Sequence, residues 1–161
     1  SIWLPADKGI IIDILGKVSR KIPSMMDYKV HIGKGSMFNT PPVFPVYASM
    51  LNLEWLKNKG GIAAIEKENE KKAQLIYSEI DLNPLFDGFA AKADRSTMNA
   101  TFTLNNDDFK ESFDTMCQEA GINGLNGHRS VGGYRASMYN ALTLESVQVL
   151  VEIMSELERK A

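Results

Sequence analysis

The sequence Thr97-Met98-Asn99-Ala100-Thr101-Phe102-Thr103-Leu104 alternates strictly between polar and apolar side chains. Successive side chains of a β-strand point to opposite faces, so this alternation predicts a strand with one apolar and one polar face. The apolar face needs partner strands and a covering layer to remove it from water. The rest of the chain is therefore expected to supply both.

Two helices are predicted before this strand. The first, from about Pro42 to Lys59, has Thr40 as its N-cap with proline next, and it is apolar on more than one face, which indicates burial on several sides. The second, from Ile62 to Ile80, has one apolar stripe that begins at Ile62. Its charged residues are interpreted as a solvent-facing side: Glu66, Lys67, Glu68, Glu70, Lys71 and Lys72.

Two more helices and a second strand are predicted after it. Asn106 or Asp107 caps the third helix, and Gly121 is placed to end it. A strand is predicted over Tyr134–Tyr139, and a fourth helix with one apolar face over Leu144–Arg159. This order of elements indicates an α/β fold in which helices pack on one face of a small sheet.

The remaining segments have no helical period. Gly9–Ile14 is apolar on both faces and favours a buried strand, although so short a run also fits a helix. Lys21–Thr40 is interpreted as a long ordered loop, and loops of that length are usually functional. Asn83-Pro84 and Asp87-Gly88 are turn signals.

Composition narrows the function. The chain of 161 residues is 44% hydrophobic and has 18 basic against 20 acidic residues, which is typical of a globular protein that does not bind nucleic acid. Its longest apolar run is far too short to cross a membrane, and its start has no signal-peptide pattern. The single cysteine, Cys117, lies on the apolar stripe of the third helix, which predicts a packed thiol in a reducing compartment. No histidine-based metal set stands out, and His31 is isolated.

The first candidate site is the sequence Gly35-Ser36-Met37-Phe38-Asn39-Thr40-Pro41-Pro42. It leads into a predicted helix, whose N-terminus offers backbone N–H groups and the positive end of the helix dipole. The Asn39 amide and the Thr40 hydroxyl add two polar groups, so the segment suits a phosphate. An ordinary helix cap after a loop explains the same residues.

The second candidate site lies within Asn126–Ser137. His128, Arg129 and Arg135 surround the pair Gly132-Gly133, which permits a tight turn. Guanidinium groups match carboxylate and phosphate oxygens, so the cluster suits a small ligand with two anionic groups. A hairpin with exposed arginines is the alternative.

Together, in this order, the two segments resemble the phosphoserine aminotransferases, pyridoxal-phosphate enzymes of aminotransferase class V. Further matches are Trp55-Leu56-Lys57 and Ala93-Asp94-Arg95-Ser96-Thr97-Met98-Asn99. The resemblance implies the small C-terminal domain of a fold-type I pyridoxal-phosphate-dependent transferase. It implies that residues 1–40 end the large cofactor domain and form an active-site loop, and that residues 41–161 form an interdomain helix and the small α/β domain.

The resemblance also implies roles for individual residues. Asn39 and Thr40 would bind the phosphate of pyridoxal 5'-phosphate in the neighbouring active site of a homodimer. His128 and Arg129 would bind the phosphate of the substrate, and Arg135 its α-carboxylate. The implied cytoplasmic reaction transfers an amino group from glutamate to 3-phosphohydroxypyruvate in serine biosynthesis, and the family also uses a related substrate of vitamin B6 synthesis.

One family feature is missing from these residues. The Schiff-base lysine of the family belongs to a Gln-Lys-Asn motif, which the sequence does not contain. We therefore expect no catalytic lysine in this chain and expect the motif upstream, in a longer protein of which these residues are the C-terminal part. Alternatives are a non-catalytic module that binds a phosphorylated carboxylate, and a structural dimerisation domain.

Overall fold

The alternating sequence forms β2 (Asn99–Leu104), the central strand of a three-stranded antiparallel sheet in the computed structural model, which describes residues 16–17 and 19–161. β1 (Phe86–Gly88) pairs with one edge of β2, and β3 (Tyr134–Ser137) pairs with the other. The register places Phe102 opposite Tyr134 and Ala100 opposite Ala136. The turn predicted at Asp87-Gly88 is wrong, because both residues belong to the short strand β1.

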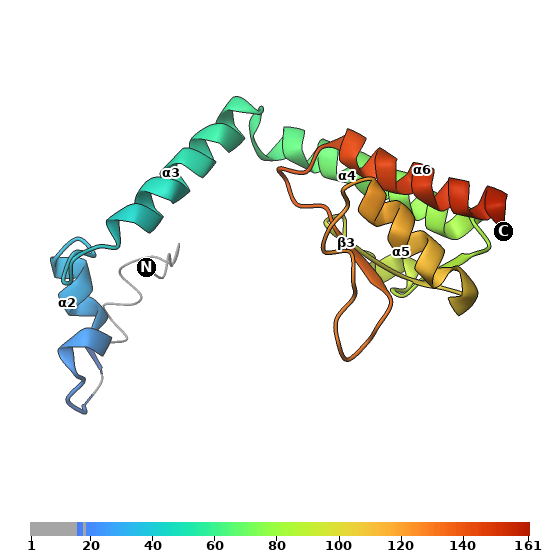
Figure 1. The fold of residues 1–161 in the computed structure, drawn as a ribbon. Coiled ribbons are helices and arrows are strands. Elements are labelled where there is room, and N and C mark those ends of the chain that lie inside the picture. The colour runs from blue at the N-terminus through green and yellow to red at the C-terminus, as the bar shows by residue number, and fades with distance from the viewer. Residues whose placement is uncertain (1–15, 18) are drawn as a thin grey trace. The chain divides into compact units, whose positions relative to one another are not determined.

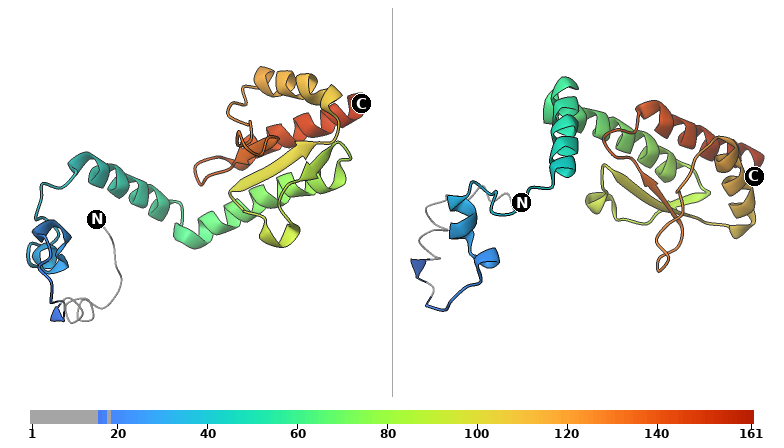
Figure 2. Two further views of the ribbon diagram at one scale, coloured as in Figure 1. Left: turned by 90° about the horizontal axis from the view of Figure 1, so that it is seen from below. Right: turned by 60° about the vertical axis from the view of Figure 1, so that its left-hand side comes forward.

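Three helices supply the covering layer. α4 (Gly61–Leu82) and α6 (Leu144–Lys160) lie side by side, and α5 (Lys110–Glu119) packs against α6 (Figures 1 and 2). A 3-10 turn, η3 (Asp107–Phe109), precedes α5, and a second, η2 (Lys92–Asp94), lies between β1 and β2. The predicted α/β fold, with helices packed on one face of a small sheet, is confirmed.

The core joins this helix layer to the sheet. Phe86, Phe102, Phe113 and Tyr134 are all buried and meet with ring centroids 5.0–6.5 Å apart. Cys117 is buried beside them, and burial raises the pKa of its thiol to about 11. The burial of Cys117 confirms the prediction of a packed thiol. Its raised pKa keeps the thiol protonated, and a protonated thiol is a poor nucleophile.

The chain divides into two compact units, residues 1–54 and 55–161, and the boundary falls within α3 (Val43–Asn58). In the first unit, η1 (Ser24–Met26) and α2 (Tyr28–Gly33) occupy part of the segment predicted to be a loop. Asp27 caps α2 by accepting a hydrogen bond from the Lys29 N–H at 2.9 Å. The helix has only six residues, too few to give a helical period in the sequence. The predicted strand Gly9–Ile14 lies outside the described residues.

The helix predicted from Pro42 to Lys59 forms as α3, but its predicted burial is wrong. None of its side chains is buried among the described residues, and Phe44 is 77% exposed. Ile62, placed on the apolar stripe of the next helix, is 78% exposed. An apolar pattern reports which faces favour burial, and it does not supply the surface that would cover them.

Lys72 corrects the prediction of a fully solvent-facing charged run. Its side chain is 1% exposed, and its ammonium donates to the backbone carbonyls of Met138, Tyr139 and Leu142 at 3.2, 2.9 and 3.0 Å. Burial lowers the pKa of Lys72, and the nearby Glu68 carboxylate opposes that shift. Lys72 thus fixes the segment that follows β3 to helix α4.

We predict that Lys72→Met lowers the free energy of unfolding by about 3 kcal/mol, because it removes the ammonium that donates to three carbonyls while keeping the volume of the side chain. Urea unfolding measures the loss. Lys71→Met is the matched control, since Lys71 is exposed on the same helix and its replacement should change stability by less than about 0.5 kcal/mol. Equal effects at the two positions would contradict the role given to Lys72.

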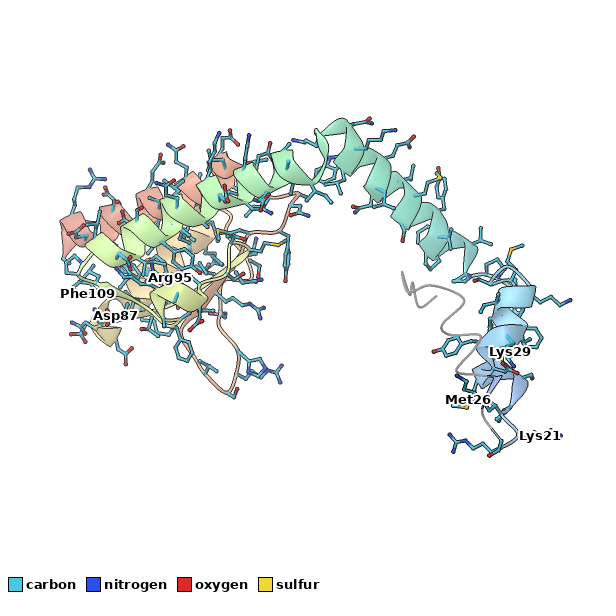
Figure 3. The ribbon with its side chains drawn as sticks, turned by 180° about the vertical axis from the view of Figure 1, so that it is seen from behind. Lys21, Met26, Lys29, Asp87, Arg95 and Phe109 are labelled. Carbon is cyan, nitrogen blue, oxygen red and sulfur yellow. The ribbon has the colours of Figure 1, made fainter. Side chains whose placement is uncertain are left out.

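A second contact fixes the segment between β1 and β2. Arg95, which is labelled in Figure 3, donates to both carboxylate oxygens of Asp81 at 2.9 and 2.6 Å. Lys92 adds an ion pair with Asp81 at 3.0 Å. The guanidinium also lies over the ring of Tyr77, 4.5 Å from its centroid. The hydrogen bonds from Arg95, and then that from Lys92, lower the pKa of Asp81 to about 2.

This shift predicts a pH dependence. The folded pKa of Asp81 lies below the value of about 3.9 expected in the unfolded chain, so the contact stabilises the fold above pH 4 and is lost as the pH falls towards 2. Asp81→Asn should lower the free energy of unfolding by about 1 kcal/mol at pH 6, and the difference from the wild type should shrink below pH 3. Urea unfolding of both proteins at each pH measures it, and a constant difference would contradict the assignment.

Candidate functional site

Asn39 and Thr40 lie in the first unit, in the exposed segment between α2 and α3. The Asn39 amide donates to the sulfur of Met25 at 3.3 Å. The segment turns at Gly35 and Ser36, which have φ angles of +57° and +66°, and the Ser36 N–H donates to the His31 carbonyl at 2.8 Å. The turn directs the chain towards α3 and leaves both side chains accessible.

Thr40 is not the N-cap of α3, in contrast to the prediction. The first helical hydrogen bond runs from the Val46 N–H to the Pro42 carbonyl at 3.1 Å, so the helix begins at Val43. The hydroxyl of Thr40 makes no hydrogen bond within the described residues. It is thus available to an anion, whereas a capping hydroxyl would already be used.

The histidine and the two arginines lie in the second unit, on and beside a loop that projects from the sheet (Figures 1 and 2). The Gly127 N–H donates to the Gly133 carbonyl at 2.9 Å and closes the loop at its base. Gly133 has a φ of +64°, and a Cβ atom there would lie 2.7 Å from the Phe102 carbonyl. Only glycine fits this close approach to β2.

His128 and Arg129 lie on this loop and are exposed. The Nδ1 atom of His128 lies 2.7 Å from the Ser130 Oγ, and it also accepts from the Ser130 N–H at 3.3 Å. The His128 carbonyl accepts from the N–H groups of Val131 and Gly132 at 2.9 and 2.8 Å. These short-range bonds hold the backbone of the loop in one turn.

Arg135 lies on β3 and faces away from the core. Its neighbours Tyr134 and Ala136 are buried, so the twofold period of the strand directs Arg135 to the opposite, exposed face. Its N–H donates to the Leu125 carbonyl at 2.7 Å. Neither Arg135 nor Arg129 forms an ion pair with a carboxylate in the described part of the chain, which leaves both guanidinium groups for a ligand.

Tyr134 fixes the start of β3 and was not singled out from the sequence. Its hydroxyl donates to Asp114 at 2.9 Å, and Lys110 donates to the same carboxylate at 2.9 Å. Burial, and then the Asp114 carboxylate, raise the pKa of Tyr134 to about 12, so the hydroxyl keeps its proton. The ring stacks on Phe102 at 5.5 Å. The one sequence feature that could have pointed to Tyr134 is its place between Gly132-Gly133 and Arg135.

The structure thus brings His128, Arg129 and Arg135 into one unit and places Asn39 and Thr40 in the other. No group of three or more histidine, cysteine or acidic side chains among the described residues could hold a metal ion. No helix among them is long and apolar enough to cross a membrane.

The model of the family Aminotransferase class-V matches residues 14–150, which is most of the chain, so the chain belongs to this family of aminotransferases. The curated relatives are phosphoserine aminotransferases. That of Flavobacterium psychrophilum is 65% identical over 97% of this chain, and that of Flavobacterium johnsoniae is 59% identical over the same share. The chain spans 45% of the length of each.

Solved structures agree with this family. The phosphoserine aminotransferase of Bacillus circulans subsp. alkalophilus has a TM-score of 0.80 at 37% identity over 92% of this chain and 41% of its own. The pyridoxal-phosphate-bound enzyme of Trichomonas vaginalis has a TM-score of 0.73 at 37% identity over 86% of this chain and 40% of its own. The chain therefore has the fold of the corresponding part of these enzymes.

The loop geometry predicts a difference between two glycines. Gly124→Ala places a side chain at a φ of +75° with open space around it, and should cost about 1 kcal/mol. Gly133→Ala adds a collision with the β2 backbone to the same strain, and should cost about 3 kcal/mol and loosen the loop. Urea unfolding, with limited proteolysis of residues 127–133, measures both. Equal costs would show that the loop does not need this close approach.

Proposed function

We propose that this chain supplies the substrate-binding part of a pyridoxal-phosphate-dependent phosphoserine aminotransferase, which exchanges an amino group between glutamate and 3-phosphohydroxypyruvate. The observation that carries the proposal is that Arg129, on a loop closed by glycines, and Arg135, on a strand of the same unit, have no carboxylate partner among residues 16–17 and 19–161. The identity of 65% to a phosphoserine aminotransferase supports it.

The two arginines suit the two anionic ends of the substrate. Arg135 is presented by a paired strand and would bind the α-carboxylate, because a guanidinium accepts a carboxylate in a bidentate geometry. Arg129 and His128 lie together on the loop and would bind the phosphate. Glutamate also has two anionic groups, so one pair of subsites can orient both amino donor and acceptor.

Asn39 and Thr40 would hold the phosphate of pyridoxal 5'-phosphate. Both are exposed, and together they offer an amide and an uncommitted hydroxyl just ahead of α3, a donor set that fits a phosphate. The cofactor, when bound, supplies an electron sink for the bonds around the amino carbon. These residues would anchor it and leave its reactive end to other groups.

The proposal extends to the whole protein. We place the Schiff-base lysine in the part of the enzyme outside these residues, and infer a homodimer in which Asn39 and Thr40 serve the neighbouring active site. From the same resemblance we infer that the enzyme is cytoplasmic and that it also acts on the related substrate of pyridoxine biosynthesis. The protonated, buried Cys117 is compatible with a reducing compartment.

Two substrates separate the roles of the arginines in the full-length enzyme. Arg129→Ala should lower kcat/KM for 3-phosphohydroxypyruvate about 100-fold and change that for hydroxypyruvate little, because only the first has a phosphate. Arg135→Ala should lower kcat/KM for both about 100-fold, since both have the carboxylate. Glutamate-dependent turnover of each substrate measures the effects.

Arg159→Ala is the matched control, because Arg159 is an exposed arginine on α6 that pairs with Glu156. It should leave both values of kcat/KM unchanged. Full activity of Arg135→Ala would remove the carboxylate assignment. A wild-type protein that binds phosphoserine but does not transaminate it would favour the non-catalytic binding module.

A further inference from the structure

The ring of His128 is held in one hydrogen-bonding state. The Ser130 backbone N–H points to its Nδ1 atom at 3.3 Å, and a backbone N–H can only donate, so Nδ1 is an acceptor. The Ser130 Oγ lies 2.7 Å from the same atom and can donate its hydroxyl proton. A neutral imidazole that accepts at Nδ1 has its own proton on Nε2.

The opposite edge of the ring is uncommitted. The Nε2 atom of His128 makes no hydrogen bond within the described residues, and the side chain is exposed. The backbone below it is fixed, because the His128 carbonyl accepts from Val131 and Gly132. With Nδ1 tied to Ser130, the N–H at Nε2 is therefore directed outward from the loop.

This arrangement matters for a phosphate. The oxygens of a phosphate dianion only accept hydrogen bonds, so Nε2 must present a hydrogen, and its lone pair would repel them. If the proton of a neutral His128 were on Nδ1 instead, the lone pair of Nε2 would face the phosphate. Ser130 blocks this state with two donors on the same nitrogen.

We propose that Ser130 is a positioning residue that fixes Nδ1 of His128 as an acceptor and so presents the Nε2–H of His128 to the substrate phosphate. This inference rests on the proposed function, and it adds a residue to the phosphate subsite that does not itself need to contact the ligand. It also gives Ser130 a specificity role, since a substrate without a phosphate gains nothing from the oriented ring.

The test uses the full-length enzyme with ¹⁵N-labelled histidine. Ser130→Ala removes the hydroxyl and keeps the longer hydrogen bond from the backbone N–H, so the Nδ1 resonance of His128 should move part of the way towards that of a nitrogen without a hydrogen-bond donor. Ser130→Thr should restore the wild-type position. The ratio of kcat/KM for 3-phosphohydroxypyruvate to that for hydroxypyruvate should fall about five-fold in Ser130→Ala and recover in Ser130→Thr. Ser112→Ala, at an exposed serine on α5, is the control and should change neither.

A phosphoserine titration, followed at the Nε2 resonance of His128, separates this inference from the proposed function. Weaker binding by about five-fold in Ser130→Ala, with recovery in Ser130→Thr, supports the inference even if the wild type has no transaminase activity, in which case only the proposed function fails. An active wild type whose Nδ1 resonance, phosphoserine affinity and substrate ratio are unchanged by Ser130→Ala overturns the inference and leaves the proposed function intact.

Discussion

The pairing of β2 with β3 is the constraint on which both the core and the site of the second unit depend. It places Phe102 opposite Tyr134, and these rings stack inside the core. Because side chains alternate along a strand, the same register directs Arg135 to the exposed face, opposite Thr101. A slip of one residue would bury the guanidinium and expose Tyr134. The energy that buries the aromatic cluster therefore also orients the Arg135 side chain.

The candidate site is held by backbone contacts more than by charges. Gly127 and Gly133 close the loop, and the strand pairing and the Leu125 carbonyl hold Arg135. The ion pairs among the described residues involve neither Arg129 nor Arg135, and one of them joins Arg95 to Asp81. Arginines already neutralised by carboxylates would have to exchange partners in order to bind a ligand. A scaffold of neutral hydrogen bonds avoids that competition and suits a subsite for a dianion.

Sequence patterns predicted the elements whose signals are local and long. The structure confirms the strand predicted from the alternation around Ala100, the apolar face of α6, and the end of α5 before Gly121. β1 was missed because three residues are too few for a period and Asp87-Gly88 has the composition of a turn. The burial of Lys72 was missed because its partners are carbonyls some 66 to 70 residues away, which leave no mark near it. The candidate site residues were predicted from their motifs and stay predictions, while the hydrogen bonds between His128 and Ser130 are seen only in the structure.

Lys72 has a consequence for how sequences in this family are compared. Its ammonium is a small cation among three carbonyl oxygens, in the place where a free metal cation would otherwise fit, and its side chain ties that charge to helix α4. A guanidinium is planar and wider and cannot direct three donors from one atom. Arginine, the usual exchange for lysine on a surface, would not fit this place. A comparison that scores the two residues as equivalent would misjudge position 72, whereas it would be right at position 71.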